Sequence, residues 1–192
     1  MSEAILTDVE RLAALADADR TFLMTEEAFR LFYEWTARPV WLYLARMSGD
    51  DRLADDLLQE TYYRFLRADA AFENDDHRRN YLFRIATNLV RDHRRRARPA
   101  ATVLDGADHL PDATGATAEQ VARRIDLGRA LHRLKPRERS LLWLAYAQGF
   151  SHEEIAATLG LKTASLKALL FRARRRLLTV MTTGGRGGRK SS

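Results

Sequence analysis

The sequence contains no cysteine in its 192 residues. A disulfide framework, a thiolate metal site and a cysteine nucleophile are therefore excluded, and the composition suits a reducing cytosol. Long apolar runs are missing too: none reaches the length of a membrane span, and the N-terminus lacks the apolar core of a signal peptide. We therefore expect a cytoplasmic protein that is not inserted in a membrane.

Signs of an enzyme are equally scarce. The five histidines are scattered along the chain, and there is no phosphate-binding glycine loop and no nucleophile motif. Asp55 and Asp56 are adjacent in the most acidic stretch, but neighbouring side chains point apart on a helix and no histidine is near in sequence. The sequence therefore predicts no catalytic residue, no metal site, no cofactor and no small-molecule substrate.

Positive charge is what the chain has in excess. It carries 32 Lys and Arg against 26 Asp and Glu, a net charge of +6 and a pI of about 10.0. Such a balance is typical of proteins that bind nucleic acid or an anionic surface.

Apolar residues recur at helical spacing, and strand-like alternation is missing, so the pattern predicts an all-α protein. We expect two small helical domains, over residues 25–98 and 119–180. Residues 99–118 have no periodic apolar face and predict a flexible linker. Residues 1–24 form an N-terminal extension, and 181–192 a flexible basic tail.

Capping residues and breakers locate the helix ends. Thr7 and Thr25 each predict a helix start, because acids follow them in the first turn. Pro39 is expected to bend or break the second of these helices, and Gly49 to end it. A further helix is predicted from about residue 79 to Pro99.

The clearest motif is SHEEIAATLGLKTASLKALLFRARRRL, which starts at Ser151. Ser151 and Glu154 suit a capping box, Gly160 permits a tight turn, and Thr163 can cap a second helix. This arrangement predicts a helix-turn-helix, although a plain helical hairpin remains the alternative. A helical wheel turns five residues of the second helix inward: Leu166, Leu169, Leu170, Ala173 and Leu177.

The outward face of that second helix predicts DNA binding. From Lys162 to Arg176 there are six basic residues and no acid, whereas a solvated helix would mix the two signs. Small alanines permit close approach to base edges, and the outward Phe171 can meet a thymine methyl group. The predicted DNA-binding residues are Ser165, Lys167, Ala168, Phe171, Arg172 and Arg175, beside the outward Ala164.

A second basic helix has the sequence YLFRIATNLVRDHRRRAR. Its apolar residues face inward, namely Leu82, Ile85, Ala86 and Leu89. Arg84, Asn88, Arg91 and Arg95 form one outward stripe that suits phosphates and, at Asn88, adenine. Tyr81 offers a stacking surface for an unpaired base. The alternative is a solvated face with Tyr81 in the core.

The stretch DDRLADDLLQE concentrates acids in this basic chain. Asp56, Gln59 and Tyr63 are predicted to line one exposed stripe, with Glu60 beside it. Acids at a helix N-terminus also offset the helix dipole, which explains Asp50 and Asp51 well but Asp56 and Glu60 poorly. The stripe therefore predicts a surface for a basic protein partner.

Together these motifs resemble a sigma-70 family transcription initiation factor of the extracytoplasmic-function (ECF) group, over about 25–98 and 119–180. DDLLQE resembles the polymerase-binding motif, which implies that Asp56, Gln59 and Glu60 contact the coiled coil of the large polymerase subunit. YLFRIATNLVRD resembles the helix that reads and melts the minus-ten element. The segment from LKPRERS through the helix-turn-helix resembles the domain that reads the minus-thirty-five element.

The resemblance implies core RNA polymerase and promoter DNA as partners, with room for an anti-sigma factor, and a linker that runs toward the RNA exit path. This sequence has Tyr81 where the family usually has Trp, and Ala164, Ala168 and Leu169 where Gly, Ser and Arg are common. We therefore do not transfer to this chain the family's preference for particular minus-thirty-five sequences. The alternative function is a LuxR-type regulator, which also has PRER before its helix-turn-helix but would show a receiver domain of alternating strands and helices.

Overall fold

A computed structural model describes residues 24–68, 70, 72–96 and 117–184. The chain divides into two compact units, Met1–Gly106 (unit 1) and Ala107–Ser192 (unit 2). Within the described residues every regular element is a helix, which confirms the predicted fold class. The helix expected at Thr7, most of the linker and most of the tail lie outside the described residues.

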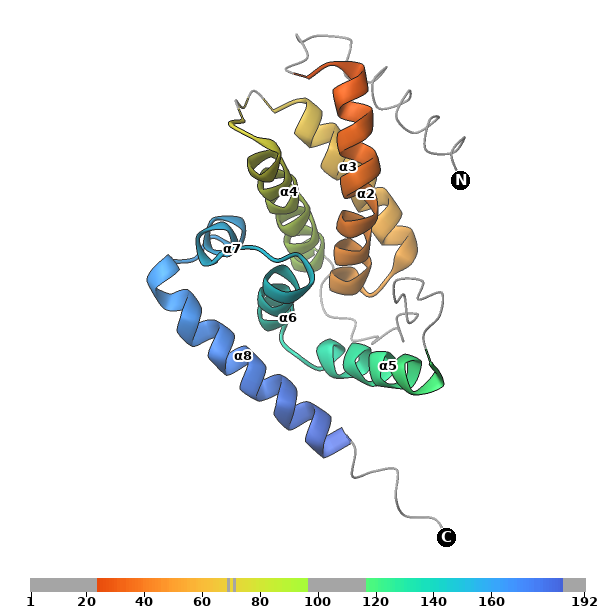
Figure 1. Cartoon of the computed structure of the whole chain (residues 1–192), viewed down its shortest axis with the longest axis vertical. Helices are drawn as coiled ribbons and strands as arrows, with labels where there is room; N and C mark the ends of the chain where they lie inside the picture. The colour runs from red at the N-terminus through yellow and green to blue at the C-terminus, as the bar shows by residue number, and fades with distance from the viewer. Residues whose placement is uncertain (1–23, 69, 71, 97–116, 185–192) are drawn as a thin grey trace. The chain divides into compact units, whose positions relative to one another are not determined.

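The described part of unit 1 consists of three helices that pack against one another: α2 (Glu26–Ser48), α3 (Asp51–Leu66) and α4 (Asp75–Arg96) (Figure 1). Thr25 caps α2 by accepting a hydrogen bond from the backbone N–H of Ala28 at 3.2 Å. Gly49, with φ at 79°, ends that helix in the left-handed conformation that glycine adopts at little cost. These two ends were predicted from the sequence.

Pro39 does not break α2, although a break was one of the two effects, bending or breaking, that the sequence predicted. The helix runs without interruption from Glu26 to Ser48. Proline in a helix interior costs about 3 kcal/mol through a lost hydrogen bond and a steric clash. Phe32 and Thr36 before it, and Val40 and others after it, are buried in the same core. Burial of both halves on one core offsets the local cost.

Helix α4 begins at Asp75, about one turn earlier than the sequence pattern predicted. The Asn74 side chain caps it by accepting a hydrogen bond from the backbone N–H of His77 at 2.8 Å. Asp75 and Asp76 in the first turn complement the helix dipole. These polar residues have no apolar periodicity, so the spacing of apolar residues could not predict the first turn of α4.

The core of unit 1 is rich in aromatic rings and contains two buried hydroxyl pairs. Tyr43 hydrogen-bonds Thr87 at 2.8 Å between α2 and α4, and Tyr62 hydrogen-bonds Thr36 at 2.6 Å between α3 and α2. Burial raises the pKa of the Tyr62 hydroxyl well above its ordinary value, although the bond with Thr36 opposes this shift. Each of these two pairs joins hydroxyls on different helices, so the pairs help to fix how the three helices meet.

Unit 2 contains α5 (Ala118–His132), α6 (Pro136–Leu142), a π-helical turn (Trp143–Ala147), α7 (His152–Leu159) and α8 (Thr163–Gly184). Aliphatic side chains build its core: Leu134, Leu141, Leu142, Leu144, Ile155, Leu166 and Leu170. Helix α5 starts one residue before the predicted domain, with Thr117 as its cap. No helix of the described part has the length and apolar character that crossing a membrane requires.

The predicted helix-turn-helix is formed by α7 and α8. Ser151 accepts from the backbone N–H of Glu154 at 3.2 Å, and the Glu154 carboxylate accepts from the backbone N–H of Ser151 at 2.6 Å. Gly160, with φ at 64°, makes the turn. Thr163 is the first residue of α8, so Lys162 precedes the helix and Thr163 is not its cap.

Candidate functional surfaces

Helix α8 presents the face that its sequence predicted. Leu166, Leu170 and Ala173 are buried, while Leu169 and Leu177 are partly buried. All the predicted contact residues are exposed: Ser165, Lys167, Ala168, Phe171, Arg172 and Arg175, together with Ala164. Phe171 is 53% exposed, and the Arg175 guanidinium lies 6.0 Å from the centroid of its ring. The face combines cations, one open ring and small side chains, a combination that suits a DNA groove.

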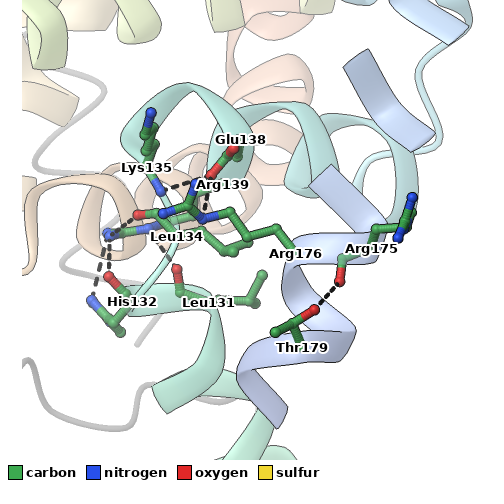
Figure 2. A network of polar contacts seen from close by, with 9 residues as sticks. All are labelled: Leu131, His132, Leu134, Lys135, Glu138, Arg139, Arg175, Arg176 and Thr179. Atoms are coloured by element: carbon green, nitrogen blue, oxygen red, sulfur yellow. Dashed lines mark hydrogen bonds and ion pairs between the residues drawn. The ribbon is translucent and has the colours of Figure 1, made fainter. Parts of the chain in front are cut away.

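Arg139, from the PRER segment, organises the helices beside α8 (Figure 2). Its buried guanidinium donates to the backbone carbonyls of Leu131 at 3.1 Å and His132 at 2.8 Å, at the end of α5. A third carbonyl, that of Leu134, lies 3.5 Å away. The last carbonyls of a helix need donors from outside it. Here the guanidinium supplies the donor to His132, and the backbone N–H of Leu134 also donates to Leu131 at 3.1 Å. Arg139 therefore fixes how α6 follows α5.

Glu138 links the start of α6 to α8. Its carboxylate accepts from the backbone N–H of Lys135 at 3.0 Å and lies 3.5 Å from the Arg176 side chain (Figure 2). Arg176 is thereby turned toward α6. One of the six cations in the predicted basic run thus has a structural contact, and the exposed Lys167, Arg172 and Arg175 remain on the outward face.

Helix α4 carries the second basic face. Leu82, Ala86 and Leu89 are buried and Ile85 is partly buried, while the stripe Arg84, Asn88, Arg91 and Arg95 is exposed along its length. Arg95 lies 3.3 Å from Asp92 on the same helix. The stripe extends over three turns, which suits a run of phosphates along one strand.

Tyr81 is packed more tightly than a free stacking platform would be. It is partly buried, and its ring centroid lies 5.2 Å from that of Phe72 and 6.3 Å from that of Phe65. The Arg84 guanidinium lies 4.6 Å from its centroid. Tyr81 therefore packs against the core rings and also has a face that Arg84 covers. A base could stack on Tyr81 only after Arg84 moves away.

Helix α3 carries the acidic face. Asp56 and Gln59 are exposed, and Glu60 and Tyr63 beside them are partly buried. Glu60 accepts a hydrogen bond from Arg64 at 2.6 Å, and the Tyr63 hydroxyl accepts one from Arg67 at 2.5 Å. No ion pair joins Asp56 to another residue that the structure describes. Of the two acids, Asp56 and Glu60, Asp56 therefore has the charge that is more available to a partner.

Asp55 has a role that the sequence did not reveal. The indole N–H of Trp41, on α2, donates to a carboxylate oxygen of Asp55 at 2.7 Å. This bond ties α2 to the turn of α3 that carries Asp56. The two residues are 14 positions apart, so no local pattern could have paired them.

No group of three or more His, Cys, Asp or Glu in the described part of the chain is arranged to hold a metal ion. The structure thus offers charged and aromatic surfaces for binding on α3, α4 and α8. In unit 1 acids predominate on α3 and arginines on α4, and α8 contains no acid at all.

Two family models match the chain, Sigma-70 region 2 over residues 32–99 and Sigma-70 region 4 over residues 124–177. The first match covers α3 and α4, and the second covers the helix-turn-helix. Among curated proteins, the ECF RNA polymerase sigma factor SigM of Bacillus subtilis is 30% identical over 156 residues, which cover 79% of this chain and 94% of SigM. SigL of Mycobacterium tuberculosis is 30% identical over 160 residues, covering 81% of this chain and 90% of SigL.

Solved structures show the same fold. The sigma factor RpoE from Bartonella quintana, in complex with the anti-sigma factor NepR, aligns with a TM-score of 0.62 at 22% identity, covering 80% of this chain and 96% of RpoE. CnrH, in complex with the cytosolic domain of CnrY, aligns with a TM-score of 0.59 at 24% identity, covering 92% and 97%. The chain matches both region 2 and region 4, and its alignments cover nearly the full length of SigM and SigL. The chain therefore belongs to the ECF group of the sigma-70 family.

Proposed function

We propose that the three exposed surfaces divide the work of a sigma factor among them. As an ECF sigma factor, the chain binds core RNA polymerase and promoter DNA and directs transcription initiation. In our assignment, α3 binds the polymerase, α4 binds the minus-ten element and α8 binds the minus-thirty-five element. The observation that carries this assignment is the separation of charge in unit 1, where α3 exposes acids and α4 exposes arginines.

The polymerase-binding set consists of Asp56, Gln59, Glu60 and Tyr63. An acidic surface attracts a basic partner and repels phosphate, so α3 suits protein and not DNA. Asp56 should contribute most, because Glu60 must first exchange its bond with Arg64 and Tyr63 its bond with Arg67. Trp41 supports the surface by holding Asp55, and so is a positioning residue.

The minus-ten set consists of Tyr81, Arg84, Asn88, Arg91 and Arg95. The arginines would hold the phosphates of one strand, and Asn88 could hydrogen-bond adenine. The guanidinium of Arg84 over Tyr81 suggests a sequence of events. When a phosphate attracts Arg84 away, the face of Tyr81 becomes open to an unpaired base.

The minus-thirty-five set consists of Ser165, Lys167, Ala168, Phe171, Arg172 and Arg175. The helix-turn-helix would place α8 in the major groove, with Lys167, Arg172 and Arg175 on phosphates or guanine edges. Ala164 and Ala168 permit a close approach but supply no hydrogen bond. Base preference would then depend on Phe171 and the cations around it.

Further partners and the location follow from this assignment. Sigma factors are not themselves enzymes, and no residue here is proposed as catalytic. We propose a cytoplasmic location, where core polymerase and the chromosome are available. We also propose an anti-sigma factor as a partner, because a protein that covers the acidic face of α3 would keep the chain off the polymerase.

A LuxR-type regulator is not favoured. Such a protein would carry a receiver domain of strands and helices in its first half. The described part of unit 1 contains only helices and corresponds to Sigma-70 region 2.

The test is reconstitution of the full chain with core RNA polymerase on a genomic promoter library. We expect initiation at a defined set of promoters that core polymerase alone does not use. Binding of the chain to DNA with no gain in initiation would refute the sigma-factor assignment and favour a regulator.

A further inference from the structure

Trp35 on α2 is the feature of unit 1 that the assigned surfaces do not use. Its side chain is 50% exposed, and Leu31, one turn earlier, is 55% exposed. Among the described residues of unit 1, these are the large hydrophobic side chains left open to solvent. The edge of the Trp35 indole is held by Phe32, with ring centroids 6.3 Å apart and planes at 68°. The ring is therefore anchored while much of it remains open.

A cation from another helix accompanies this open ring. The Arg79 guanidinium, from the start of α4, lies 5.7 Å from the centroid of Trp35 and 5.8 Å from that of Phe83. Arg38 follows Trp35 by three residues on α2 and is exposed. An anchored aromatic ring beside a guanidinium is the combination that binds single-stranded nucleic acid, since the ring stacks on a base and the cation holds a phosphate.

Several acids also lie near Trp35 in the described part of unit 1. Glu34 pairs with Arg30 at 3.4 Å, and Asp75 at the start of α4 pairs with Arg78. Glu27 is exposed on the same side of α2, two turns before Trp35. Glu73 and Asp76 are exposed near the start of α4 as well. The preference for nucleic acid therefore rests on the open ring and the guanidinium beside it, and not on net charge.

Arg79 lies on the same helix as the proposed minus-ten surface, near the start of α4. Arg79 and Tyr81 are two residues apart, so they lie on different sides of the first turns of α4. A strand that engages Tyr81 could pass over the start of α4 and reach Trp35 on α2, which packs against α4. Trp35 is open in this structure, whereas Phe65, Phe72 and Arg84 surround Tyr81.

We propose that Trp35, backed by Arg79, is a second stacking site for an unpaired base of the melted promoter. The indole stacks on the base, and Arg79 or Arg38 holds the adjoining phosphate. The proposal rests on the proposed function, because it requires a holoenzyme that opens DNA. Its ligand is single-stranded DNA, and stacking makes it tolerant of sequence.

The experiment uses holoenzyme reconstituted from the full chain and core polymerase. Two DNA probes carry one promoter found in the initiation assay, one fully paired and one with an unpaired bubble over the minus-ten region. Three variants are compared with the unmodified chain: Trp35→Ala, Trp35→Phe and Leu31→Ala. Leu31→Ala is the matched control, because it removes an exposed apolar side chain from the same helix with no base-stacking ring.

We expect Trp35→Ala to weaken binding of the bubble probe about tenfold, the effect of one lost base stack. Trp35→Phe should keep most of the affinity, and Leu31→Ala should leave it unchanged. Because the indole carries no charge, Trp35→Ala should not alter the salt slope, whereas Arg79→Gln should reduce it by about 0.7 for one single-strand phosphate. With 5-iododeoxyuridine in the unpaired strand, irradiation should crosslink the DNA to Trp35.

Other outcomes overturn the proposal. Equal losses for Trp35→Ala and Leu31→Ala, or weaker core binding by Trp35→Ala, would identify the surface as an apolar site for a protein. Unchanged bubble binding by Trp35→Ala would exclude any contact. Failure of the unmodified chain to bind core or to initiate would refute the proposed function instead, and this is measured first.

Discussion

Unit 1 builds its core around aromatic rings, whereas unit 2 builds its core mainly from leucine, isoleucine and alanine. Seven aromatic side chains are buried in the described part of unit 1: Phe29, Phe32, Tyr33, Tyr43, Tyr62, Phe65 and Phe83. In the described part of unit 2, Phe150 is the buried aromatic residue. Tyrosine brings hydroxyl groups into a core, and each must find a partner. Unit 1 therefore adds side-chain bonds between helices to its apolar core, whereas unit 2 adds backbone caps and the Arg139 network.

The two units also differ in where they place their charged residues. Unit 1 places acids on α3 and arginines on α4, so it suits a protein and a nucleic acid at once. Unit 2 concentrates cations on α8 and suits DNA alone. The difference implies that substitutions in unit 1 can separate polymerase binding from DNA opening, while substitutions on α8 should affect promoter binding only.

The largest expected effect is that of Asp56→Arg in unit 1. Reversing a charge in a close interfacial pair removes an attraction and adds a repulsion, together about 2 to 5 kcal/mol, which is a loss of about 30-fold or more in affinity for core polymerase. Thermal stability should change little, because the site is exposed. Core binding and melting temperature would be measured on one preparation.

Glu26→Arg is the matched control for Asp56→Arg, because Glu26 is an exposed acid in the first turn of α2. It should cost a fraction of a kcal/mol of stability through the helix dipole and leave core binding intact. An Asp56→Arg protein that melts earlier yet binds core normally would contradict the assignment of α3.

Asn88→Ala and Tyr81→Ala should impair DNA opening more than initial promoter binding. Loss of one captured base costs about 1 to 3 kcal/mol, a reduction of about 5- to 150-fold in open complex. Permanganate reactivity of the melted thymines would measure it, with fully paired promoter binding measured alongside. Tyr81→Phe keeps the ring and should behave normally, and unchanged reactivity in both alanine variants would remove α4 from this role.

Arg139→Leu should destabilise unit 2 by about 1 to 3 kcal/mol, because it removes the donor to the His132 carbonyl and one of the donors to the Leu131 carbonyl at the end of α5. Hydrogen exchange should accelerate in α5 and α6 but not in α2, α3 or α4. Arg137→Leu, an exposed position of the same helix, is the control and should change little. Equal acceleration in both variants would mean that the network contributes nothing to unit 2.

Tyr62→Phe should cost about 1 kcal/mol of the stability of unit 1, through loss of its bond with Thr36. Burial raises the pKa of Tyr62 in the folded state, so above about pH 10 the unfolded chain releases a proton that the folded chain keeps. The Tyr62 contribution to stability is therefore present below pH 10 and declines above it. The phenylalanine variant should lose less stability between pH 8 and about pH 10.5.

Urea denaturation in a Trp143→Phe background would follow unit 1 through the emission of Trp35 and Trp41. Tyr146→Phe, at a site 63% exposed in unit 2, is the control for the pH dependence. If both phenylalanine variants show the same dependence, the effect does not come from the buried hydroxyl.

The smallest expected effects are on α8. Lys167→Ala or Arg172→Ala should each reduce the salt slope of promoter binding by about 0.9 if one phosphate contact is lost. Phe171→Ala should instead relax preference at one base position with little change in slope. Equal loss on every sequence by Phe171→Ala would mean that the ring reads no base. Binding of each of the three variants to core polymerase should remain intact.

The sequence by itself determined the helices with local signals at their ends. Thr25, Gly49, Ser151 and Gly160 act on backbone groups within a few residues, so their effect can be predicted without knowing the fold. The exposed stripes of α3, α4 and α8 also followed from helical periodicity, because burying one face leaves the other in solvent. The roles of those stripes in binding are predictions.

Only the tertiary structure decided how residues distant in sequence meet. The core that keeps α2 whole at Pro39, the packing of Tyr81 against Phe65 and Phe72, and the bond from Trp41 to Asp55 all join separate helices. The contact of Arg79 with Trp35 is of the same kind. Local propensities are worth fractions of a kcal/mol per residue, whereas burying one large side chain contributes about 1.5 to 3 kcal/mol, so packing decides where the two conflict.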